Sequence, residues 1–68
     1  MAASEKQVGA CIRASRDAKG WFQKDLAKAS RLPIRTIGRI ERGEVDVRLS
    51  THSRIANALG ISVKDLLP

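Results

Sequence analysis

Three glycines and one proline divide this 68-residue chain into short segments, and this division limits what it can fold into. Gly20, Gly43 and Gly60 each follow a stretch with the apolar spacing of a helix, a position where glycine commonly ends one. Pro33 suits the first turn of a helix, where its missing N–H would be unbonded in any case. The length leaves room for a single domain, which we expect to span residues 1–68.

The segments between these residues have the periodicity of helices. Alternating β-branched residues, the mark of strands, occur only in the short run 45–47. Serines at positions 4 and 62 are suited to cap the first and last helices. We therefore expect an all-α fold, a compact five-helix bundle, with helices over residues 4–19, 23–30, 33–42, 49–59 and 62–67. The side chains expected to point inward include Val8, Cys11, Ile12, Leu26, Ala27, Leu49, Ile55, Ala58 and Leu59.

The charge of the chain indicates a polyanionic partner. Thirteen Lys and Arg residues face seven Asp and Glu, for a net charge of +6 and a pI near 10.5. Four of the six excess positive charges fall within residues 23–43, while residues 44–68 are neutral. This concentration favours a nucleic-acid partner over a merely solvated basic surface. With 43% apolar residues and no apolar run near the roughly 18 residues of a membrane span, we expect a globular protein without a membrane partner.

The inventory of reactive residues argues against an enzyme. Cys11 and His52 are the only cysteine and histidine, so no cluster with metal-ligand spacing exists, and we expect no metal, cofactor or small-molecule ligand. His52 is expected to be a half-buried helix residue. Because no secretory leader opens the chain and Cys11 cannot form an internal disulfide, a cytoplasmic location is expected.

The second and third segments have the spacing of a helix-turn-helix motif over about residues 23–42. Counted from Gln23, the fifth position is Ala27, the fifteenth Ile37 and the eighteenth Ile40. A small residue suits the fifth position, where the two helices touch, and branched apolar residues suit the positions that meet the core.

Residues 23–27, 35–43 and 58–62 resemble the phage repressor and Cro-like helix-turn-helix family (XRE type), and the resemblance extends over about residues 8–67. It implies a lambda-repressor-like bundle that binds double-stranded DNA sequence-specifically, with the second helix of the motif in the major groove. Family members read bases from the first two turns of that helix, which here gives Ile34, Arg35 and Arg39. Arginine can grip guanine with two hydrogen bonds, and isoleucine can meet a thymine methyl. The alternatives are that the arginines grip phosphates and that Ile34 packs inside.

The resemblance also implies contacts to the DNA backbone. Family members open the first helix of the motif with a Gln that meets a phosphate, and Gln23 stands there; a solvent-facing Gln is the alternative. Arg42 and Arg48 flank the loop that lies on phosphate in the family, and solvated charge is the alternative for both. The full set of expected backbone contacts is Gln23, Lys24, Thr36, Gly38, Arg42 and Arg48.

Further positions concern stability. Glu41 matches a family acid that pairs with an arginine late in the first helix, here Arg16, which implies a structural ion pair. Arg31 stands where the family prefers Gly because the turn has a positive φ, so the turn either costs roughly 1 kcal/mol or is reshaped. Phe22 occupies the usual place of a capping Ser or Thr.

We expect a transcriptional regulator, a repressor that binds an inverted-repeat operator as a homodimer, with its own promoter among the candidate targets. The family often dimerises through its C-terminal region, which here suggests Ile61, Val63, Leu66 and Leu67, although some of these must also close the monomer core. The alternative is an antitoxin or adaptor whose main role is to bind a partner protein.

Overall fold

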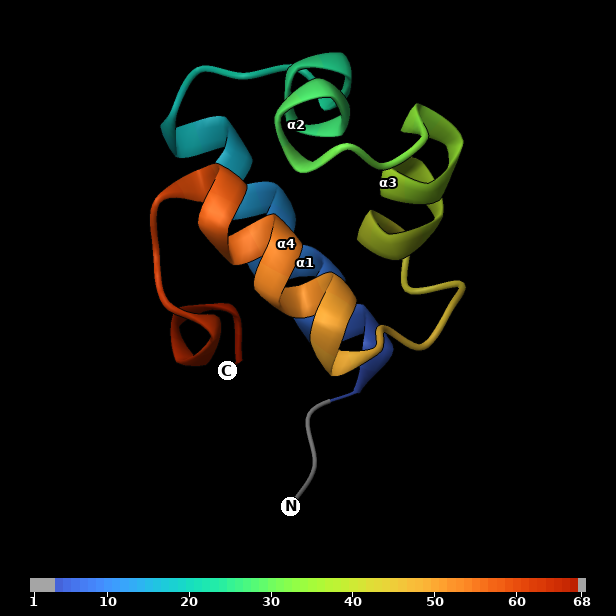
Figure 1. Ribbon diagram of the computed structural model, residues 1–68. Helices are drawn as coiled ribbons and strands as arrows, with labels where there is room; N and C mark the ends of the chain where they lie inside the picture. Colours follow the sequence, from blue (N-terminus) through green and yellow to red (C-terminus); the bar gives the residue numbers. More distant parts are fainter. Residues whose placement is uncertain (1–3, 68) are drawn as a thin grey trace.

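The ends of the helices follow the local signals of the sequence. In the computed structural model, which describes residues 4–67, the α-helices are α1 (Glu5–Ala18), α2 (Gln23–Ser30), α3 (Ile34–Glu41) and α4 (Leu49–Leu59), followed by the 3₁₀ turn η1 (Val63–Leu66) (Figure 1). Gly20, Gly43 and Gly60 all have a φ near +72°, as expected of residues that end helices. Within residues 4–67 no strand is present, so the expectation of an all-helical fold is confirmed.

The prediction of a fifth helix is wrong, because η1 is a single 3₁₀ turn. Its backbone bonds join residues three apart: the Asp65 N–H donates to the Ser62 carbonyl and the Leu67 N–H to the Lys64 carbonyl. The expected cap at Ser62 is present as a capping box, in which the Asp65 carboxylate accepts from the Ser62 N–H at 3.1 Å. A four-residue segment does not reach a second α-helical turn, so the cap starts the turn but no helix follows.

A capping box is also present at the start of α1, and one of its two hydrogen bonds is present at the start of α2. Ser4 Oγ accepts from the Gln7 N–H at 3.1 Å, and Gln7 Oε1 accepts in return from the Ser4 N–H at 3.0 Å. At α2 the N-cap is Phe22, which has no side-chain acceptor, but the Asp25 carboxylate accepts from its N–H at 2.7 Å. One of the two capping bonds therefore survives without a Ser or Thr.

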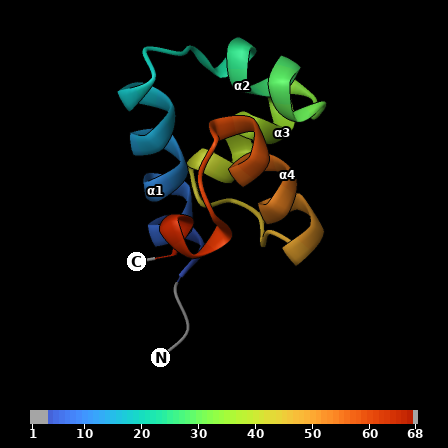
Figure 2. The ribbon, with the colours of Figure 1, turned by 60° about the vertical axis from the view of Figure 1, so that its left-hand side comes forward.

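Five side chains with no exposed surface form the centre of the core, and each element supplies one. They are Ile12 of α1, Leu26 of α2, Ile37 of α3, Ile55 of α4 and Leu66 of η1. Figure 2 shows η1 beside the beginning of α1, at a distance from α2, and η1 packs against both α1 and α4. The core thus extends from the helix-turn-helix to the C-terminal turn.

One expected core residue is on the surface. Leu49 was expected to point inward, but it is 73% exposed. The buried face of α4 is made by Ile55, Ala56 and Leu59, and Leu49 lies on nearly the same side of the helix as Ala56, seven positions or almost two full turns earlier. Leu49 is the first residue of α4, and the prediction is wrong because helical phase tells which side a residue faces but not whether another element covers that end of the helix.

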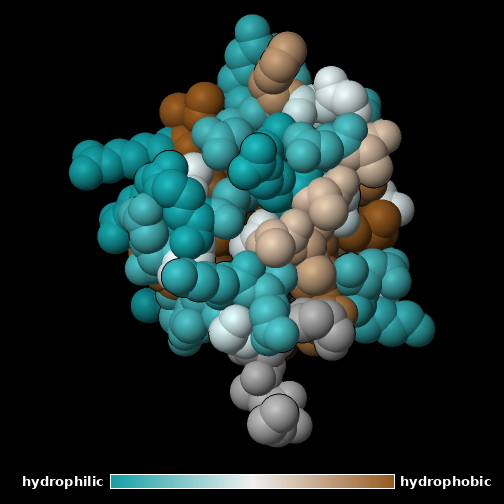
Figure 3. Space-filling view, turned by 180° about the vertical axis from the view of Figure 1, so that it is seen from behind, coloured by the Kyte–Doolittle hydropathy of each residue, from teal (hydrophilic) through white to brown (hydrophobic). Residues whose placement is uncertain are grey.

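A glycine absent from the sequence-based predictions allows α1 to approach the end of α3. A Cβ at Gly9 would lie 2.4 Å from the carbonyl oxygen of Ile40 and 2.8 Å from that of Glu41. No side chain fits there, so the two backbones approach each other in a way that only glycine permits. Seen from behind, the molecule is mostly hydrophilic, and its strongly apolar residues form separate small patches (Figure 3).

Candidate nucleic-acid interface

The turn between α2 and α3 keeps the backbone that a helix-turn-helix needs. Arg31 has φ 60° and ψ 36°, the left-handed region that glycine occupies more easily, so the turn is not reshaped and its cost is about 1 kcal/mol. Arg54 of α4 offsets this strain: its Nε donates to the Ser30 carbonyl at 3.2 Å and its Nη2 to the Arg31 carbonyl at 2.7 Å. The sequence offered no signal for this contact, because Arg54 lies 23 residues beyond Arg31.

The α3 helix has a buried side and an exposed side. Ile37, Gly38 and Ile40 are buried, whereas Arg35 and Arg39 are exposed and lie four positions apart, on one face of the helix. Ile34 is 52% exposed, so the alternative that it packs inside is wrong. The three expected base-reading residues are therefore all on the surface of α3.

Arg16 and Glu41 meet in the nearly buried contact between α1 and the end of α3. The guanidinium binds the carboxylate with two hydrogen bonds, Nε to Oε2 at 2.7 Å and Nη2 to Oε1 at 2.9 Å, and the two side chains are only 9% and 3% exposed. Arg16 Nη1 also donates to the Trp21 carbonyl at 2.7 Å. The hydrogen bonding that the Arg16 guanidinium donates to the Glu41 carboxylate holds the pKa of Arg16 above its ordinary value.

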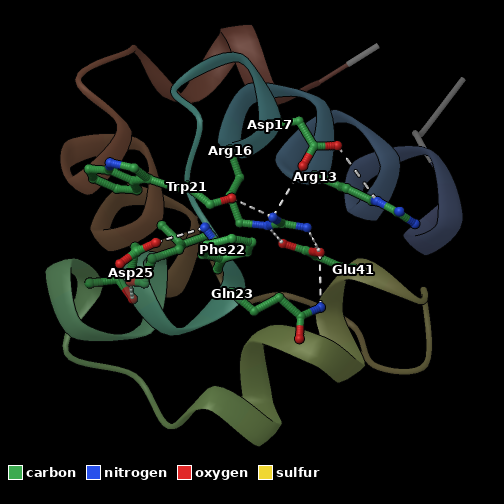
Figure 4. Close-up of polar contacts among 10 residues, drawn as sticks. Arg13, Arg16, Asp17, Trp21, Phe22, Gln23, Asp25 and Glu41 are labelled. Carbon is green, nitrogen blue, oxygen red and sulfur yellow. Dashed lines mark hydrogen bonds and ion pairs between the residues drawn. The ribbon is translucent and has the colours of Figure 1, made fainter.

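The same carboxylate reaches the first residue of α2. Gln23 Nε2 donates to Glu41 Oε1 at 3.1 Å, so this half-buried side chain is bonded within the protein rather than left to solvent (Figure 4). Glu41 thereby connects α1, α2 and α3 at one point. The result is that Gln23 has a defined orientation at the N-terminus of α2, where backbone N–H groups favour an anion.

Gly38 creates the space in which Gln23 and Arg42 come together. The point that a Cβ of Gly38 would occupy lies 3.0 Å from Nη1 of Arg42 and 3.5 Å from Oε1 of Gln23. Two expected phosphate contacts, one from the start of α2 and one from the end of α3, are therefore neighbours. Gly38 itself is buried beneath them and has no side chain to offer to DNA.

A residue that sequence reasoning missed lies beside two expected contacts. Glu44 Oε2 accepts from Arg42 Nε at 2.5 Å, and its Oε1 lies 3.9 Å from Arg39 Nε. The hydrogen bond and the charge of Arg42, together with the charge of Arg39, hold the pKa of Glu44 below its usual range. The only signal in the sequence was an acid shortly after two arginines.

The remaining expected backbone contacts are Lys24, Thr36 and Arg48. Lys24 is exposed and its Nζ is 5.8 Å from the centre of the exposed Phe22 ring. Thr36 is half-buried on α3, and Arg48 is exposed at the start of α4. A shallow hollow joins the beginnings of α2 and α3 and is lined by Arg16, Phe22, Gln23, Lys24 and Ile34.

The four residues expected at a dimer interface have different surroundings. Leu66 has no exposed surface and belongs to the monomer core, so its assignment to the interface is wrong. Ile61 and Val63 are half-buried against that core, and Leu67 is 45% exposed. A second copy could contact the last three only.

A metal site, an unpaired histidine and a membrane-spanning helix are three further features that residues 4–67 could contain. No group of three or more His, Cys, Asp and Glu side chains there could hold a metal ion. His52 is half-buried, as expected, and its Nε2 has no hydrogen-bond partner among these residues. None of the helices is both long and apolar enough to cross a membrane.

Comparison with known proteins agrees with this geometry. Residues 12–66 match the HTH_3 family model, described as helix-turn-helix. Among solved structures, the restriction-modification controller protein C.AhdI from Aeromonas hydrophila is 35% identical, with a TM-score of 0.90 over 93% of this chain and 96% of that one. The clp gene regulator ClgR from C. glutamicum is 34% identical, with a TM-score of 0.87 over 91% and 80%. A search of curated proteins gave no match.

A third structure, the hypothetical transcription factor NHTF from Neisseria, is 30% identical, with a TM-score of 0.90 over 94% of this chain and 74% of that one. The chain belongs to the HTH_3 helix-turn-helix family. Its fold and family are those of DNA-binding transcription regulators.

Proposed function

We propose that this protein is a sequence-specific repressor that binds double-stranded DNA in the cytoplasm through α3. The observation that carries the proposal is the division of α3: Ile37 and Ile40 anchor it in the core, while Ile34, Arg35 and Arg39 face outward. A helix held in this way can lie in the major groove without rearrangement of the bundle. This proposal assumes the lambda-repressor-like arrangement expected from the sequence.

Contacts to the DNA backbone would fix the position of α3 in the groove. Gln23 and Arg42 meet above Gly38, next to the N-terminus of α2, and together they suit one phosphate. Lys24 and Arg48 add exposed positive charge, and the half-buried Thr36 adds a hydroxyl. These contacts orient the protein, and the α3 arginines supply the sequence preference.

We further propose that the protein acts as a homodimer on an inverted repeat, in which it occludes a promoter, its own among the candidates. Two-fold symmetry in the protein requires matching symmetry in the DNA, with half-sites about 10 to 10.5 base pairs apart or a multiple of that spacing. C.AhdI, named as a controller protein, is matched over nearly its whole length, which supports regulation by a domain of this size.

Selection of bound duplexes from a random pool tests the function directly. The expected product is an inverted repeat with guanines at positions met by Arg35 or Arg39. A selection by the Arg35→Ala/Arg39→Ala double variant serves as the control and should lose those guanines. Failure of the unmodified protein to enrich any sequence would contradict the proposal.

Single substitutions separate base reading from backbone contact. Arg39→Ala should cost about 1–3 kcal/mol on the selected duplex and relax the preference at one base pair, because two hydrogen bonds to guanine are lost. Gln23→Ala should weaken binding to all duplexes by the same factor, because it removes a phosphate contact. Fluorescence anisotropy on a panel of duplexes with one altered base pair each measures both. A uniform loss for Arg39→Ala would assign this arginine to the backbone instead.

A further inference from the structure

Glu44 joins two arginines that the proposed function uses in different ways. Its carboxylate touches Arg42, placed at the phosphate, with one oxygen and lies near Arg39, placed at a base, with the other. All three side chains are about half exposed, so the cluster is on the surface, where DNA would lie, and does not contribute to the core. A structural role in the bundle does not explain it.

Both approaches to Glu44 involve the Nε edge of the guanidinium. Nε is the atom of Arg42 at 2.5 Å and the atom of Arg39 at 3.9 Å. Each guanidinium has five N–H donors, and the four on the terminal nitrogens remain available. The terminal edge is the one that can still meet guanine O6 and N7 or two phosphate oxygens. Glu44 therefore restrains the arginines without occupying the atoms that DNA would need.

We propose that Glu44 is a positioning residue for DNA recognition, which fixes the guanidinium of Arg39 for guanine by linking it to Arg42. The proposal rests on the proposed function and names a specificity determinant within the same site. Glu44 should then have two opposite effects on DNA binding, one on affinity and one on specificity. A carboxylate close to DNA lowers affinity for every sequence, since it repels phosphate, while the restrained Arg39 raises the difference between matching and non-matching sequences.

Two variants that remove the same charge from the same loop test this proposal. Glu44→Gln removes the negative charge and with it the ion pairs to both arginines. Asp46→Asn removes a negative charge two residues along, from an exposed side chain with no ion pair to an arginine in residues 4–67. The probes are the duplex selected by the unmodified protein and the same duplex with the base pair read by Arg39 replaced.

Both variants should bind the replaced duplex more tightly than the unmodified protein does, because each has one negative charge fewer. Glu44→Gln should also lower the ratio of the two affinities by about three- to tenfold, a part of the discrimination that a bidentate arginine supplies. Asp46→Asn should keep that ratio. The midpoint of thermal unfolding of Glu44→Gln should stay close to the original, which shows that the effect is not one of folding.

The outcomes distinguish this proposal from the one on which it rests. If the unmodified protein enriches a sequence and Glu44→Gln keeps the full affinity ratio, Glu44 contributes charge alone and the positioning role is overturned. A ratio that falls equally in Asp46→Asn would overturn it as well, because the loop charge would then be the cause. If the unmodified protein enriches nothing, the proposed function itself fails, and the positioning role with it.

Discussion

At the scale of single residues, the role of a charged pair in this protein depends on its burial: a buried pair stabilises the fold, and an exposed pair is available for DNA binding. Arg16 and Glu41 are almost removed from water and bind each other through two hydrogen bonds, whereas the contacts of Glu44 lie in solvent. Coulomb attraction is strong and desolvation costly in the first case, and both are weak in the second. Loss of a partner should therefore affect folding in one pair and DNA binding in the other.

Glu41→Ala should destabilise the fold by up to about 3 kcal/mol, because the nearly buried Arg16 guanidinium loses both hydrogen bonds to Glu41 and, among the described residues, keeps only the exposed Asp17 carboxylate, 3.1 Å from its Nη1, as a counter-charge. It also frees Gln23, so DNA affinity should fall even where the variant is still folded. Urea unfolding followed by circular dichroism measures the first effect. Glu44→Gln is the control and should change the unfolding midpoint little; an equal loss in both variants would show that burial of the Arg16–Glu41 pair does not matter.

Arg31→Gly should stabilise the protein by up to about 1 kcal/mol, since glycine adopts a φ of 60° without a Cβ penalty. The greater freedom of glycine in the unfolded chain takes back part of this gain. Arg31→Ala is the matched control: it removes the same side chain but keeps the penalty. Thermal unfolding that showed the same gain for both variants would assign the effect to the arginine charge rather than to the backbone.

At the scale of elements, two glycines in helices have different neighbours. Gly9 of α1 faces backbone carbonyls of α3, which have no room to move, and Gly38 of α3 faces the mobile end of the Arg42 side chain. Both are unfavourable for a helix by about 1 kcal/mol relative to alanine. Gly9 is required because α1 packs closely on α3, and Gly38 because its missing side chain leaves space for Arg42 and Gln23.

Gly9→Ala should destabilise the protein by roughly 1–3 kcal/mol, because the cost of overpacking between α1 and α3 exceeds the gain in helix propensity. Gly38→Ala should leave stability unchanged or raise it, yet weaken DNA binding, because the new methyl group displaces the Arg42 guanidinium from Gln23. Chemical denaturation and DNA titration of the two variants give the comparison. Unchanged DNA affinity in a folded Gly38→Ala protein would count against the shared phosphate contact.

At the scale of the whole molecule, η1 connects the core to the proposed dimer surface. Leu66 closes the monomer core, and the next residue, Leu67, leaves nearly half of its surface exposed. The last residue of η1 therefore faces the core, and the residue that follows it reaches the surface. Ile61 and Val63, half-buried beside the core, would complete the surface that a second copy covers.

Leu67→Asp should weaken the dimer by roughly tenfold or more, because it places a charge in an interface that excludes water. Analytical ultracentrifugation over a range of concentrations gives the dissociation constant. Leu49→Asp is the control, as it also replaces an exposed leucine but one outside the proposed surface of Ile61, Val63 and Leu67. Equal dissociation constants for the original protein and Leu67→Asp would place the interface elsewhere.

Much of the fold could be predicted because its signals are local. The bounds of α2 and α4, the caps at Ser4 and Ser62 and the helix-ending glycines depend on residues no more than a few positions apart. The prediction of a fifth helix is wrong because it relied on the cap at Ser62 alone. A cap can start a helix, but the four residues that follow are too few to extend it. The prediction for Leu49 is wrong because the position of a residue around a helix does not tell whether another element covers that end of the helix.

The four α-helices, the helix-turn-helix spacing and the concentration of positive charge on residues 23–43 could all be read from the amino-acid sequence. Four other features became visible only when the helices were packed together: Leu66 belongs to the core, α1 needs glycine at position 9, Arg54 holds the turn, and Glu44 lies between two arginines. The two groups differ in the range of their interactions. Caps and periodicity act within one or two turns of the chain, whereas burial, close approach and charge pairing depend on which surfaces the packed helices bring together.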